Sequence, residues 1–507
     1  MSFAIQEWVN SNDKKTFRKE AWKELLMIEN FEKKQPIKKI EKITYDLIIK
    51  ETEIASNIIK EMTSKNLSKV IQASLIRIYE VYEPQYTKGA SILLVPFLLL
   101  DLDFQEIADF FYGFQKIFVP NLYKKESYYR LCGFKLVRHL LLYHDPDLVQ
   151  HLDQFRGDIT KIATNSIFTA LIYFYINSLK FFKLKKSEDS TQNFSEQKIT
   201  LFNNFYLIWD YLLLSRDPCW IVFLICSFFL IRKKEIMNAN SHENLQLVLD
   251  QLHFKMEDNP EEIIHKARQI EFKTPISFKQ LMMNTLYSEN GKFDSNQYFY
   301  ISKFVALPID LVEILNLWEN NKQIEEKNAK KLSFVVIDCR KQEEVSFGTL
   351  PLALHLDPSK FFDDPVAFTE NLEVFLAMKG SNLAFLGTGN LNQDKELFLI
   401  VLQFITRGFP HVSICQGGFQ KYLDFVKEGK CKNQQKEEKK NKEKQKESEM
   451  KQKQPQEIFS IYDSDDNLDE NLSSDQDKIN DLINEIINEE DDLDDLDDLD
   501  DLDDLMK

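Results

Sequence analysis

The chain has 507 residues, of which 43% are hydrophobic and 12% aromatic, and this size predicts two or three domains with substantial cores. The net charge of −17 is concentrated at one end of the chain, because residues 457–507 carry 22 acidic side chains and only two lysines. Residues 1–429 have a net charge of −2, which excludes the basic domain expected of a nucleic-acid-binding protein.

Cysteine usage and hydropathy indicate a cytoplasmic protein. The six cysteines are widely spread and never form a CxxC pair, so we expect free thiols in a reducing compartment. The sequence starts without the basic and apolar regions of a signal peptide. Its longest uncharged apolar run, Cys219–Ile231, has 13 residues, whereas a bilayer span needs about 20. We therefore predict a buried core helix at this run and only peripheral contact with membranes.

Two patterns of secondary structure follow one another along the chain. Residues 1 to about 325 repeat apolar side chains at helical spacing, with breaks at several prolines. From residue 331 onward a helical pattern at Lys395–Thr406 lies among three short apolar runs, which are Phe334–Ile337, Leu383–Leu386 and His411–Cys415. Alternation of short strands and a helix predicts an α/β unit with a parallel sheet.

The predicted organisation is that of a multidomain chain. An all-α domain covers residues 1–240, a helical extension or linker 241–330, an α/β domain 331–428, and a low-complexity tail, basic and then acidic, 429–507. The tail has too little apolar surface to offset the entropy of ordering, so we predict that it is disordered. Isoleucines and leucines recur among its acidic residues between 479 and 505, and this segment is either a docking peptide or a solvated tail.

Three short motifs occur in order along the helical region. They are Arg18-Lys-Glu-Ala-Trp22, Tyr82-Glu-Pro-Gln-Tyr-Thr-Lys-Gly89 and Ile208-Trp-Asp-Tyr-Leu-Leu-Leu-Ser-Arg-Asp-Pro218. In this order they resemble the RxxxW, YxPexGYxQGM and IWDxxLxxxDP motifs of the TBC domain family. The resemblance implies an all-helical domain, and the active members of this family are GTPase-activating proteins for Rab GTPases.

Active TBC domains supply an arginine from IxxDxxR and a glutamine from YxQGM to the nucleotide. The resemblance places these positions at Lys60, in Ile54–Lys60, and at Lys88, in Tyr86–Gly89. A lysine lacks the planar fork of arginine, and an ammonium group has no acceptor with which to position water. Lys60 and Lys88 are therefore either lost finger positions or solvated surface lysines, and both interpretations predict no GTPase activation.

The segments Val335-Val-Ile-Asp-Cys-Arg340 and Gln416-Gly-Gly-Phe419 resemble the opening and the late glycine turn of rhodanese domains. Sulfurtransferases of this class carry a cysteine that begins a loop after a central strand. Here that strand and loop are Leu383–Leu391, and Leu386 occupies the nucleophile position. Leu391 lies near the place of the arginine that closes the loop in related phosphatases. The resemblance therefore implies a binding scaffold without sulfurtransferase or phosphatase activity.

Other residue types with catalytic or metal-binding chemistry do not form a complete site in the sequence. Cys339 and Cys415 end predicted strands, so they pack inside as small apolar residues or replace the missing nucleophile. His139, His144 and His151 lie within 13 residues, but their spacing does not place all three on one helical face. We expect neither a metal nor a cofactor.

The order of the two domains and the join segments Lys273–Phe278 and Val305–Leu315 resemble a family of TBC–rhodanese vesicle-bridging adaptors. The resemblance implies a non-enzymatic trafficking adaptor that binds golgin-type tethers at the trans-Golgi network and captures endosome-derived vesicles. A Rab GTPase is a further partner that it implies. Nothing in the sequence resembles the PH-like domain that engages endosomal sorting machinery, so that partner is not supported. The alternative function is an active Rab GTPase-activating protein with non-standard finger residues.

Overall fold

The structure is a computed structural model. The residues that it describes are 14–28, 40–62, 66–82, 89–100, 102–121, 127–185, 194–255, 257–287, 295–321, 332–359, 366 and 375–427. We predict that residues 429–507 form a disordered tail. These residues lie outside the described set, so this remains a prediction. All elements named below belong to one unit, Met1–Phe425, and Val426–Lys507 forms a second unit.

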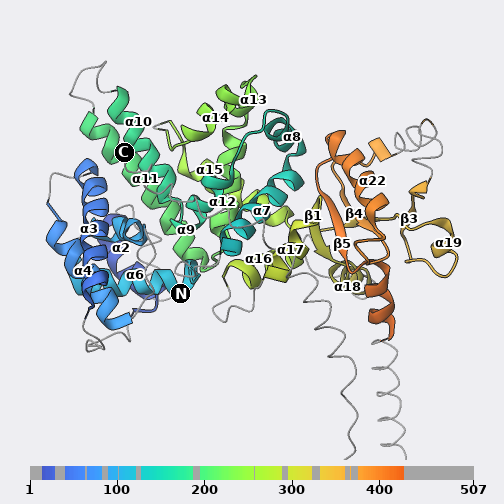
Figure 1. The fold of residues 1–507 in the computed structure, drawn as a ribbon, viewed down its shortest axis with the longest axis horizontal. Coiled ribbons are helices and arrows are strands. Elements are labelled where there is room, and N and C mark those ends of the chain that lie inside the picture. Colours follow the sequence, from blue (N-terminus) through green and yellow to red (C-terminus); the bar gives the residue numbers. More distant parts are fainter. Residues whose placement is uncertain are drawn as a thin grey trace, which may run out of the picture. The chain divides into compact units, whose positions relative to one another are not determined.

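Helices make up the first part of the chain (Figure 1). In chain order they are α2 (Lys14–Leu25), α3 (Lys42–Met62), α4 (Ser68–Tyr82), the 3-10 helix η2 (Ala90–Leu94), α5 (Val95–Leu98), α6 (Phe104–Phe118), α7 (Ser127–His144), α8 (Pro146–Gln154), α9 (Thr160–Phe168), α10 (Ile172–Lys185), α11 (Phe194–Ser215), α12 (Trp220–Ile231), α13 (Lys233–Met237), α14 (His242–Asp250), α15 (Pro260–Lys273), α16 (Ile276–Leu286) and α17 (Ser295–Ser302). Their starts follow local chemistry, since Asp103 caps α6 in a capping box with Glu106 and Pro146 occupies the first turn of α8.

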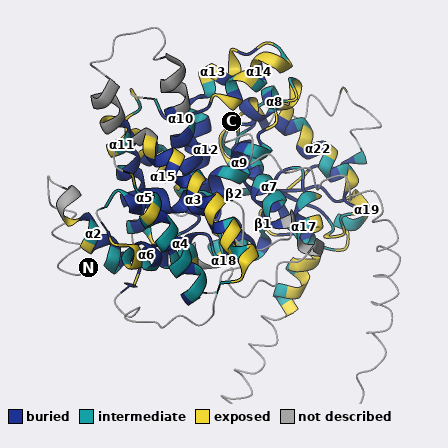
Figure 2. Cartoon of the chain, turned by 60° about the vertical axis from the view of Figure 1, so that its left-hand side comes forward, coloured by how far each residue is buried: buried dark blue, intermediate teal, exposed yellow. Residues whose placement is uncertain are grey.

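Helix α12 is the centre of the helical part. Its residues Trp220 to Phe229 are all buried, and it packs against α15, α9 and α7. Figure 2 shows α12 as a buried element among helices with exposed outer faces. The buried core helix predicted at Cys219–Ile231 is therefore confirmed. Within the described part of the chain, no single helix combines the length and apolar character of a membrane span, and α9 with α10 meets that criterion only as a pair bent by 110°.

The first and third sequence motifs contact each other and so join α2 to α11. The Asp210 carboxylate accepts hydrogen bonds from Arg18 Nε (2.8 Å) and Nη2 (2.7 Å) and from Trp22 Nε1 (2.9 Å). Trp209 stacks on Phe114, with ring centroids 4.6 Å apart. The bidentate contact satisfies the charges that burial removes from water, so these motif residues hold the fold together.

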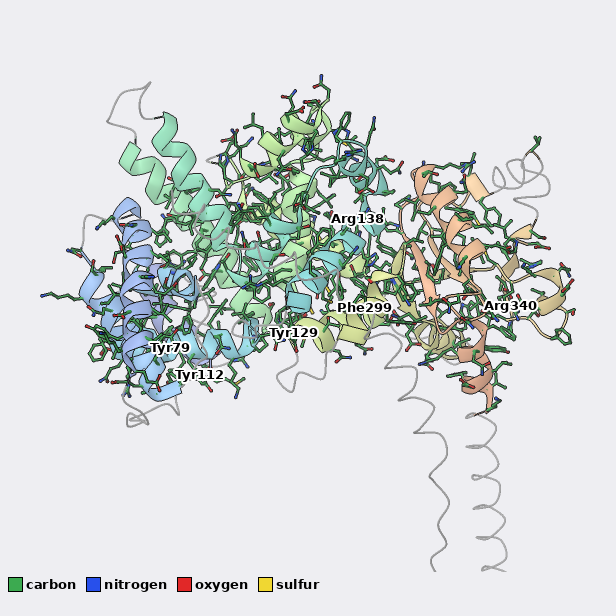
Figure 3. All side chains as sticks on the ribbon, viewed as in Figure 1. Tyr79, Tyr112, Tyr129, Arg138, Phe299 and Arg340 are labelled. Atoms are coloured by element: carbon green, nitrogen blue, oxygen red, sulfur yellow. The ribbon has the colours of Figure 1, made fainter. Side chains whose placement is uncertain are left out.

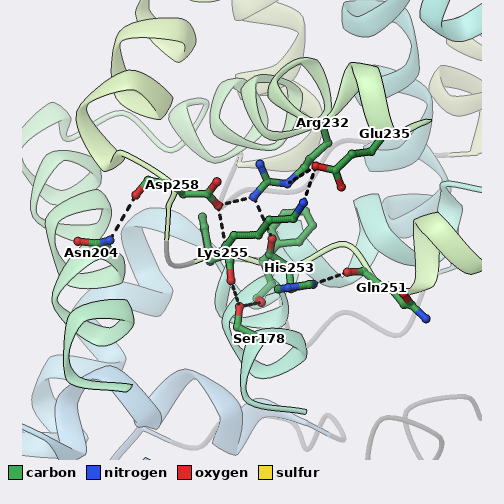
Figure 4. Close-up of polar contacts among 10 residues, drawn as sticks. Ser178, Asn204, Arg232, Glu235, Gln251, His253, Lys255 and Asp258 are labelled. Carbon is green, nitrogen blue, oxygen red and sulfur yellow. Dashed lines mark hydrogen bonds and ion pairs between the residues drawn. The ribbon is translucent and has the colours of Figure 1, made fainter. Parts of the chain in front are cut away.

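A second buried ion pair fixes the loop between α14 and α15 (Figure 4). Arg232, at the end of α12, pairs with Asp258, and both side chains are less than 10% exposed. Ser178 Oγ donates to the carbonyl of Phe254 at 2.8 Å, and Asn204 Nδ2 donates to the carbonyl of Asp258 at 3.3 Å. The loop has no regular hydrogen-bond ladder, so these side chains supply its partners.

A five-stranded parallel sheet follows, with the strand order β1-β5-β4-β2-β3. Its elements are β1 (Leu307–Asp310), α18 (Leu311–Asn321), β2 (Phe334–Asp338), α19 (Gln342–Val345), β3 (Leu354–His355), β4 (Asn382–Leu386), α22 (Lys395–Thr406) and β5 (Val412–Gln416). Helix α22 packs against β4 and β5, with the rings of Phe385 and Phe404 4.9 Å apart. On the other face, Ile314 and Leu315 of α18 join Val336 and Leu386 in one buried cluster. Both faces are thus covered, as parallel sheets require.

The three strands and the helix predicted from residue 331 onward are confirmed, and the α/β fold class with them. The prediction of helix after helix over residues 1 to about 325 is wrong at β1, which pairs with β5 at the sheet edge. Leu307-Pro-Ile-Asp310 is too short to show a strand period, and Pro308 is tolerated because an edge strand leaves some backbone groups unpaired. Long-range pairing, which no local pattern encodes, determines this strand.

The helical part and the sheet share specific contacts within the unit Met1–Phe425. Tyr143 Oη lies 3.1 Å from Asn382 Oδ1, and Gln150 Nε2 donates to the carbonyl of Ile405 at 2.7 Å. The Glu313 carboxylate of α18 accepts from the first N–H groups of α16, at Ile276 (2.9 Å) and Ser277 (2.8 Å). These hydrogen bonds satisfy helix ends and strand edges across the contact.

Candidate functional site

The loop after β4 contains the position that the rhodanese resemblance assigns to a nucleophile. Leu386, the last residue of β4, is fully buried and packs in the cluster with Ile309 and Cys415. Its carbonyl accepts the N–H of Cys339 at 2.8 Å. Leu391 lies further along the loop, partly exposed. Neither leucine carries a group that attacks an electrophile or binds an anion, and Leu386 belongs to the core.

Asp394 occupies the concave side of this loop. Its carboxylate accepts hydrogen bonds from Thr388 N (2.8 Å), Thr388 Oγ1 (2.9 Å) and Gly389 N (3.1 Å). A Cβ on Gly387 would lie 2.6 Å from the same carboxylate. Successive backbone N–H groups of this kind form an anion-binding nest, and here the anion is a side chain of the protein itself.

The glycine turn after β5 packs directly on this loop. Gly389 has a φ of +103°, and a Cβ there would lie 2.2 Å from the carbonyl oxygen of Gly417. Phe419 N donates to the carbonyl of Gly387 at 2.8 Å. Only glycine allows both the left-handed backbone and the close approach, so the loop and the turn form one rigid edge of the sheet.

A pocket of about 300 Å³ opens beside the loop, with Cys339 and Asp394 among its lining residues. Burial, together with the Asp338 and Asp394 carboxylates, raises the pKa of the Cys339 thiol well above its usual value. Burial also raises the pKa of Cys415, inside the sheet. Both cysteines are buried, which is the first of the two alternatives that the sequence leaves open, and burial favours the neutral thiol.

Arg340, from the opening motif of the domain, has a structural role (Figure 3). Its guanidinium makes hydrogen bonds to the Asp338 carboxylate at 2.7 and 2.9 Å and to the carbonyl of Gly348 at 2.8 Å. It also lies 3.5 Å from the ring centroid of Phe419. The side chain is buried and fully engaged, so it positions the loops around the pocket.

The second candidate site lies where α3 meets η2. The Glu51 carboxylate accepts hydrogen bonds from the backbone N–H of Gly89 (3.0 Å) and Ser91 (3.1 Å). Gly89 directly follows Lys88, the position assigned to the glutamine finger, and Lys88 itself lies outside the described residues. Glu51 is buried among apolar residues of α3, and the sequence analysis missed it.

Lys60 is exposed in the last turn of α3. It lies nine residues beyond Glu51, which corresponds to about 14 Å along the helix axis. The residue one turn from Glu51 is Ile54, which is partly buried. The contact that Glu51 makes with Gly89 and Ser91 therefore lies more than two helical turns from Lys60.

The other end of the segment before Gly89 is fixed at Tyr82. Its ring stacks on Tyr112 with centroids 3.9 Å apart, and its hydroxyl donates to Asp109 at 2.5 Å. Burial and the Asp109 carboxylate raise the pKa of Tyr82 far above its usual value. The finger segment thus begins and ends at rigid positions on α4 and η2.

The three histidines that the sequence analysis considered contact different elements. His139 of α7 is buried, and burial lowers its pKa to about 3. His144 Nε2 lies 3.2 Å from Thr274 Oγ1, and His151 Nε2 lies 3.0 Å from the carbonyl of Ile236. Across the residues that the structure describes, no group of three or more His, Cys, Asp or Glu side chains is arranged to hold a metal ion.

Two family comparisons match separate parts of the chain. The Rab-GTPase-TBC domain matches residues 4–179, and the rhodanese-like domain matches residues 319–424. The second match begins after β1, although β1 pairs in the same sheet. The first match covers the helical part as far as residue 179, within α10, and the second covers the α/β part from α18 onward.

Curated relatives share part of the chain. A tRNA uridine(34) hydroxylase of Prochlorococcus marinus (strain MIT 9312) is 30% identical over 122 residues, which are 23% of this chain and 38% of that protein. The protein of the same name from strain MIT 9515 is 25% identical over 170 residues, 31% of this chain and 53% of the relative. This chain thus spans between a third and about half of the length of these relatives. Motif order, architecture and family matches agree that the chain carries a Rab-GTPase-TBC domain followed by a rhodanese-like domain.

Proposed function

We propose that this protein is a non-enzymatic trafficking adaptor whose TBC and rhodanese-like domains bind protein partners. The observation that carries the proposal is the Asp394 carboxylate in the nest of Thr388 and Gly389 N–H groups. A sulfurtransferase or phosphatase needs this nest for a persulfide or a phosphoryl oxygen. A fixed carboxylate repels such an anion and already uses the donors.

The TBC domain is a pseudoenzyme in this proposal. Rab GTPase activation depends on positioning and on a cation that neutralises charge on the transferring phosphoryl group, worth about 10³–10⁵ in rate for an arginine finger. Lys60 replaces the arginine, and it lies nine residues along α3 from Glu51, which binds Gly89. Lys88 cannot orient water as a glutamine does.

The proposed partners are golgin-type tethers at the trans-Golgi network, and the proposed outcome is capture of endosome-derived vesicles. This assignment depends on the resemblance of the domain order and join segments to TBC domain family member 23. Binding of a Rab GTPase without acceleration of hydrolysis is compatible with it. The name of the relatives gives tRNA hydroxylation as their activity. We do not propose it for this chain, because residues 1–429 have a net charge of −2, whereas binding of nucleic acid depends on basic side chains that neutralise phosphates.

Direct binding of purified components tests the adaptor function. The full chain is immobilised and offered golgin fragments and a panel of Rab GTPases, and GTP hydrolysis by the same Rab proteins is measured. We expect a golgin fragment to be retained and hydrolysis to be unchanged. Failure of every golgin fragment to bind would remove the golgin assignment.

Activation through Lys60 is the second candidate function, favoured by the exposure of this side chain at the end of α3. Its test compares Lys60→Ala with Lys50→Ala, a second exposed lysine of the same helix. An acceleration above about tenfold that Lys60→Ala alone abolishes would replace the adaptor by an active GTPase-activating protein.

Membrane recruitment follows the partner in this proposal, because lipid attraction of the basic segment 430–453, with a net charge of +5, is opposed by the adjacent acidic one. We expect a chain ending at Glu428 to localise to trans-Golgi or vesicle membranes in cells. Diffuse staining of that chain, with residues 429–507 on the membranes, would show that the tail is responsible.

A further inference from the structure

Two imidazole rings meet where the TBC domain contacts the rhodanese-like sheet. His144 is the last residue of α7, and His411 directly precedes β5. Their ring centroids are 5.7 Å apart with an interplanar angle of 83°. Tyr143 contacts both rings, at 5.2 Å from His144 and 5.1 Å from His411. Tyr143 and His144 of the TBC domain and His411 of the rhodanese-like domain therefore form one cluster of rings.

Hydrogen bonds hold this cluster in place. The His411 N–H donates to the carbonyl of Tyr143 at 2.6 Å, so the backbones of the two domains are joined directly. His411 Nδ1 lies 3.2 Å from the carbonyl of Gly380, and a carbonyl accepts only, so we assign the proton to Nδ1. His144 Nε2 lies 3.2 Å from Thr274 Oγ1. Each ring can make these contacts as a neutral imidazole.

The charged groups packed around the rings are mostly cationic. Lys266 and Lys273 of α15 and His411 act on His144, and Lys273 also acts on His411. Together with burial, which is the largest cause, they lower the pKa of His144 to about 3 and hold that of His411 below its usual value. An added positive charge on either ring would be repelled here.

Acidic groups near the cluster are engaged with other partners. The Asp145 carboxylate binds Lys233 Nζ at 2.8 and 2.9 Å. Glu313 accepts the first N–H groups of α16. Asp147 Oδ1 and Lys379 Nζ both lie beside Gly408, at 2.7 and 3.3 Å from the place that a Cβ would take there. None of these contacts offers compensation to an imidazolium at the cluster.

We propose that His144 and His411 make the contact between the two domains acid-labile, so that the domains separate when an imidazole gains a proton. Both rings favour the closed contact only while neutral. A histidine whose pKa is lower in the closed state than in the open state favours closure above its open-state pKa of about 6.5. That preference is lost as the pH falls from about 6.5 toward the closed-state value.

The expected size of the effect follows from linkage. Between about pH 7 and about pH 5.5, a ring with an open-state pKa near 6.5 and a much lower closed-state pKa raises the ratio of open to closed contact about eightfold. His411 adds to this ratio because its pKa is lowered in the same direction. The contact therefore weakens over a narrow range of mild acidity.

Hydrogen exchange of the full chain at about pH 7 and about pH 5.5 tests the proposal, with rates corrected for intrinsic exchange. We expect the peptide that contains the His411 amide to lose about eightfold or more of its protection at the lower pH and to be less protected than α12 at both pH values. Unchanged protection at His411 would overturn the proposal. Protection at His411 equal to that of α12 would also overturn it, because the His411 amide would then exchange only through global unfolding.

Variants identify the responsible groups. The double variant His144→Phe with His411→Asn removes both titrating rings, and asparagine tolerates the left-handed backbone of position 411, whose φ is 60°. It should keep equal protection at the two pH values. His265→Gln, at an exposed histidine of α15, should behave like the wild type. If the double variant loses protection at the lower pH as the wild type does, another group causes the response and the assignment to His144 and His411 is wrong. Whether the contact opens at all is read from the wild-type protein.

Discussion

Asp394 is the residue that most clearly separates this rhodanese-like domain from an anion-binding one. Its carboxylate accepts three hydrogen bonds from Thr388 and Gly389 at the mouth of the parallel sheet. A ligand at the carboxyl ends of such strands normally uses these donors. The loop thus keeps the shape of an anion-binding nest, but its donors already bind a carboxylate of the same chain.

Replacement of Asp394 by alanine should both destabilise the domain and reopen the nest. We expect the free energy of unfolding to fall by about 1–3 kcal/mol, because the Thr388 and Gly389 N–H groups and the Thr388 hydroxyl lose their acceptor. Added sulfate should restore part of the loss by occupying the vacated place. Thermal unfolding with and without sulfate measures both effects. Asp424→Ala, at an exposed carboxylate, is the control for general salt stabilisation, and equal sulfate responses in the two variants would contradict an anion nest.

Gly389 and Gly380 form a matched pair for the role of close packing. Their φ angles are +103° and +101°, but a Cβ at Gly389 would lie 2.2 Å from the Gly417 carbonyl, whereas nothing lies within 4 Å of one at Gly380. Alanine at either position should cost about 1–3 kcal/mol for the backbone conformation. Gly389→Ala should cost clearly more, measured by chemical unfolding. Equal losses would show that the loop and the glycine turn can move apart.

At the scale of elements, buried carboxylates hold helix ends and loops that lack regular partners. Glu51 of α3 binds the start of η2, Asp210 of α11 binds α2, and Asp258 binds the end of α12. Each joins segments that are distant in the chain, so the ends of the helices are fixed by tertiary contacts as well as by local caps. Removing one partner leaves the other charge buried.

The Arg232–Asp258 pair tests this view. Asp258→Ala should lower the free energy of unfolding by about 3–5 kcal/mol, because the Arg232 guanidinium stays buried without its partner. Asp153→Ala breaks the pair with Arg138, whose side chains are 57% and 30% exposed, and should cost at most about 1 kcal/mol. Denaturant titration of both variants measures the difference. Similar losses would mean that burial does not control the strength of these pairs.

At the scale of the whole molecule, acid sensitivity should be a general property of the TBC domain. His139 is buried in α7, and burial lowers its pKa to about 3, below the value of about 6.5 in an unfolded chain. A histidine shifted in this direction leaves stability unchanged above about pH 6.5. Below it, the unfolded state binds a proton that the folded state does not, and stability falls.

His139→Leu should reduce this dependence. The free energy of unfolding of the wild type should fall by about 1.4 kcal/mol per pH unit from this group between about pH 6 and about pH 4. The variant should lose that part of the slope and keep the rest, as measured by denaturant titration across this range. His265→Gln should leave the slope unchanged, and an unchanged slope in His139→Leu would show that the ring is not neutral in the folded chain.

The strands β2, β4 and β5 and the helices α12 and α22 can be predicted from the sequence alone, because each is a run whose own periodicity and length match one type of structure. The motif positions also placed Leu386 at the end of a central strand. Strand β1 cannot be predicted in this way, because its four residues form a strand only through pairing with β5.

The chemistry of the candidate sites depends on contacts that form only when the chain folds. Asp394 lies eight residues after Leu386, at the start of a helix, and Glu51 lies inside an amphipathic helix, so neither has a local sequence signal. Their partners are backbone N–H groups, which every residue except proline carries and which no side-chain pattern distinguishes. Where those groups point depends on how β4, α22, α3 and η2 pack, and packing is set by contacts between residues far apart in the chain.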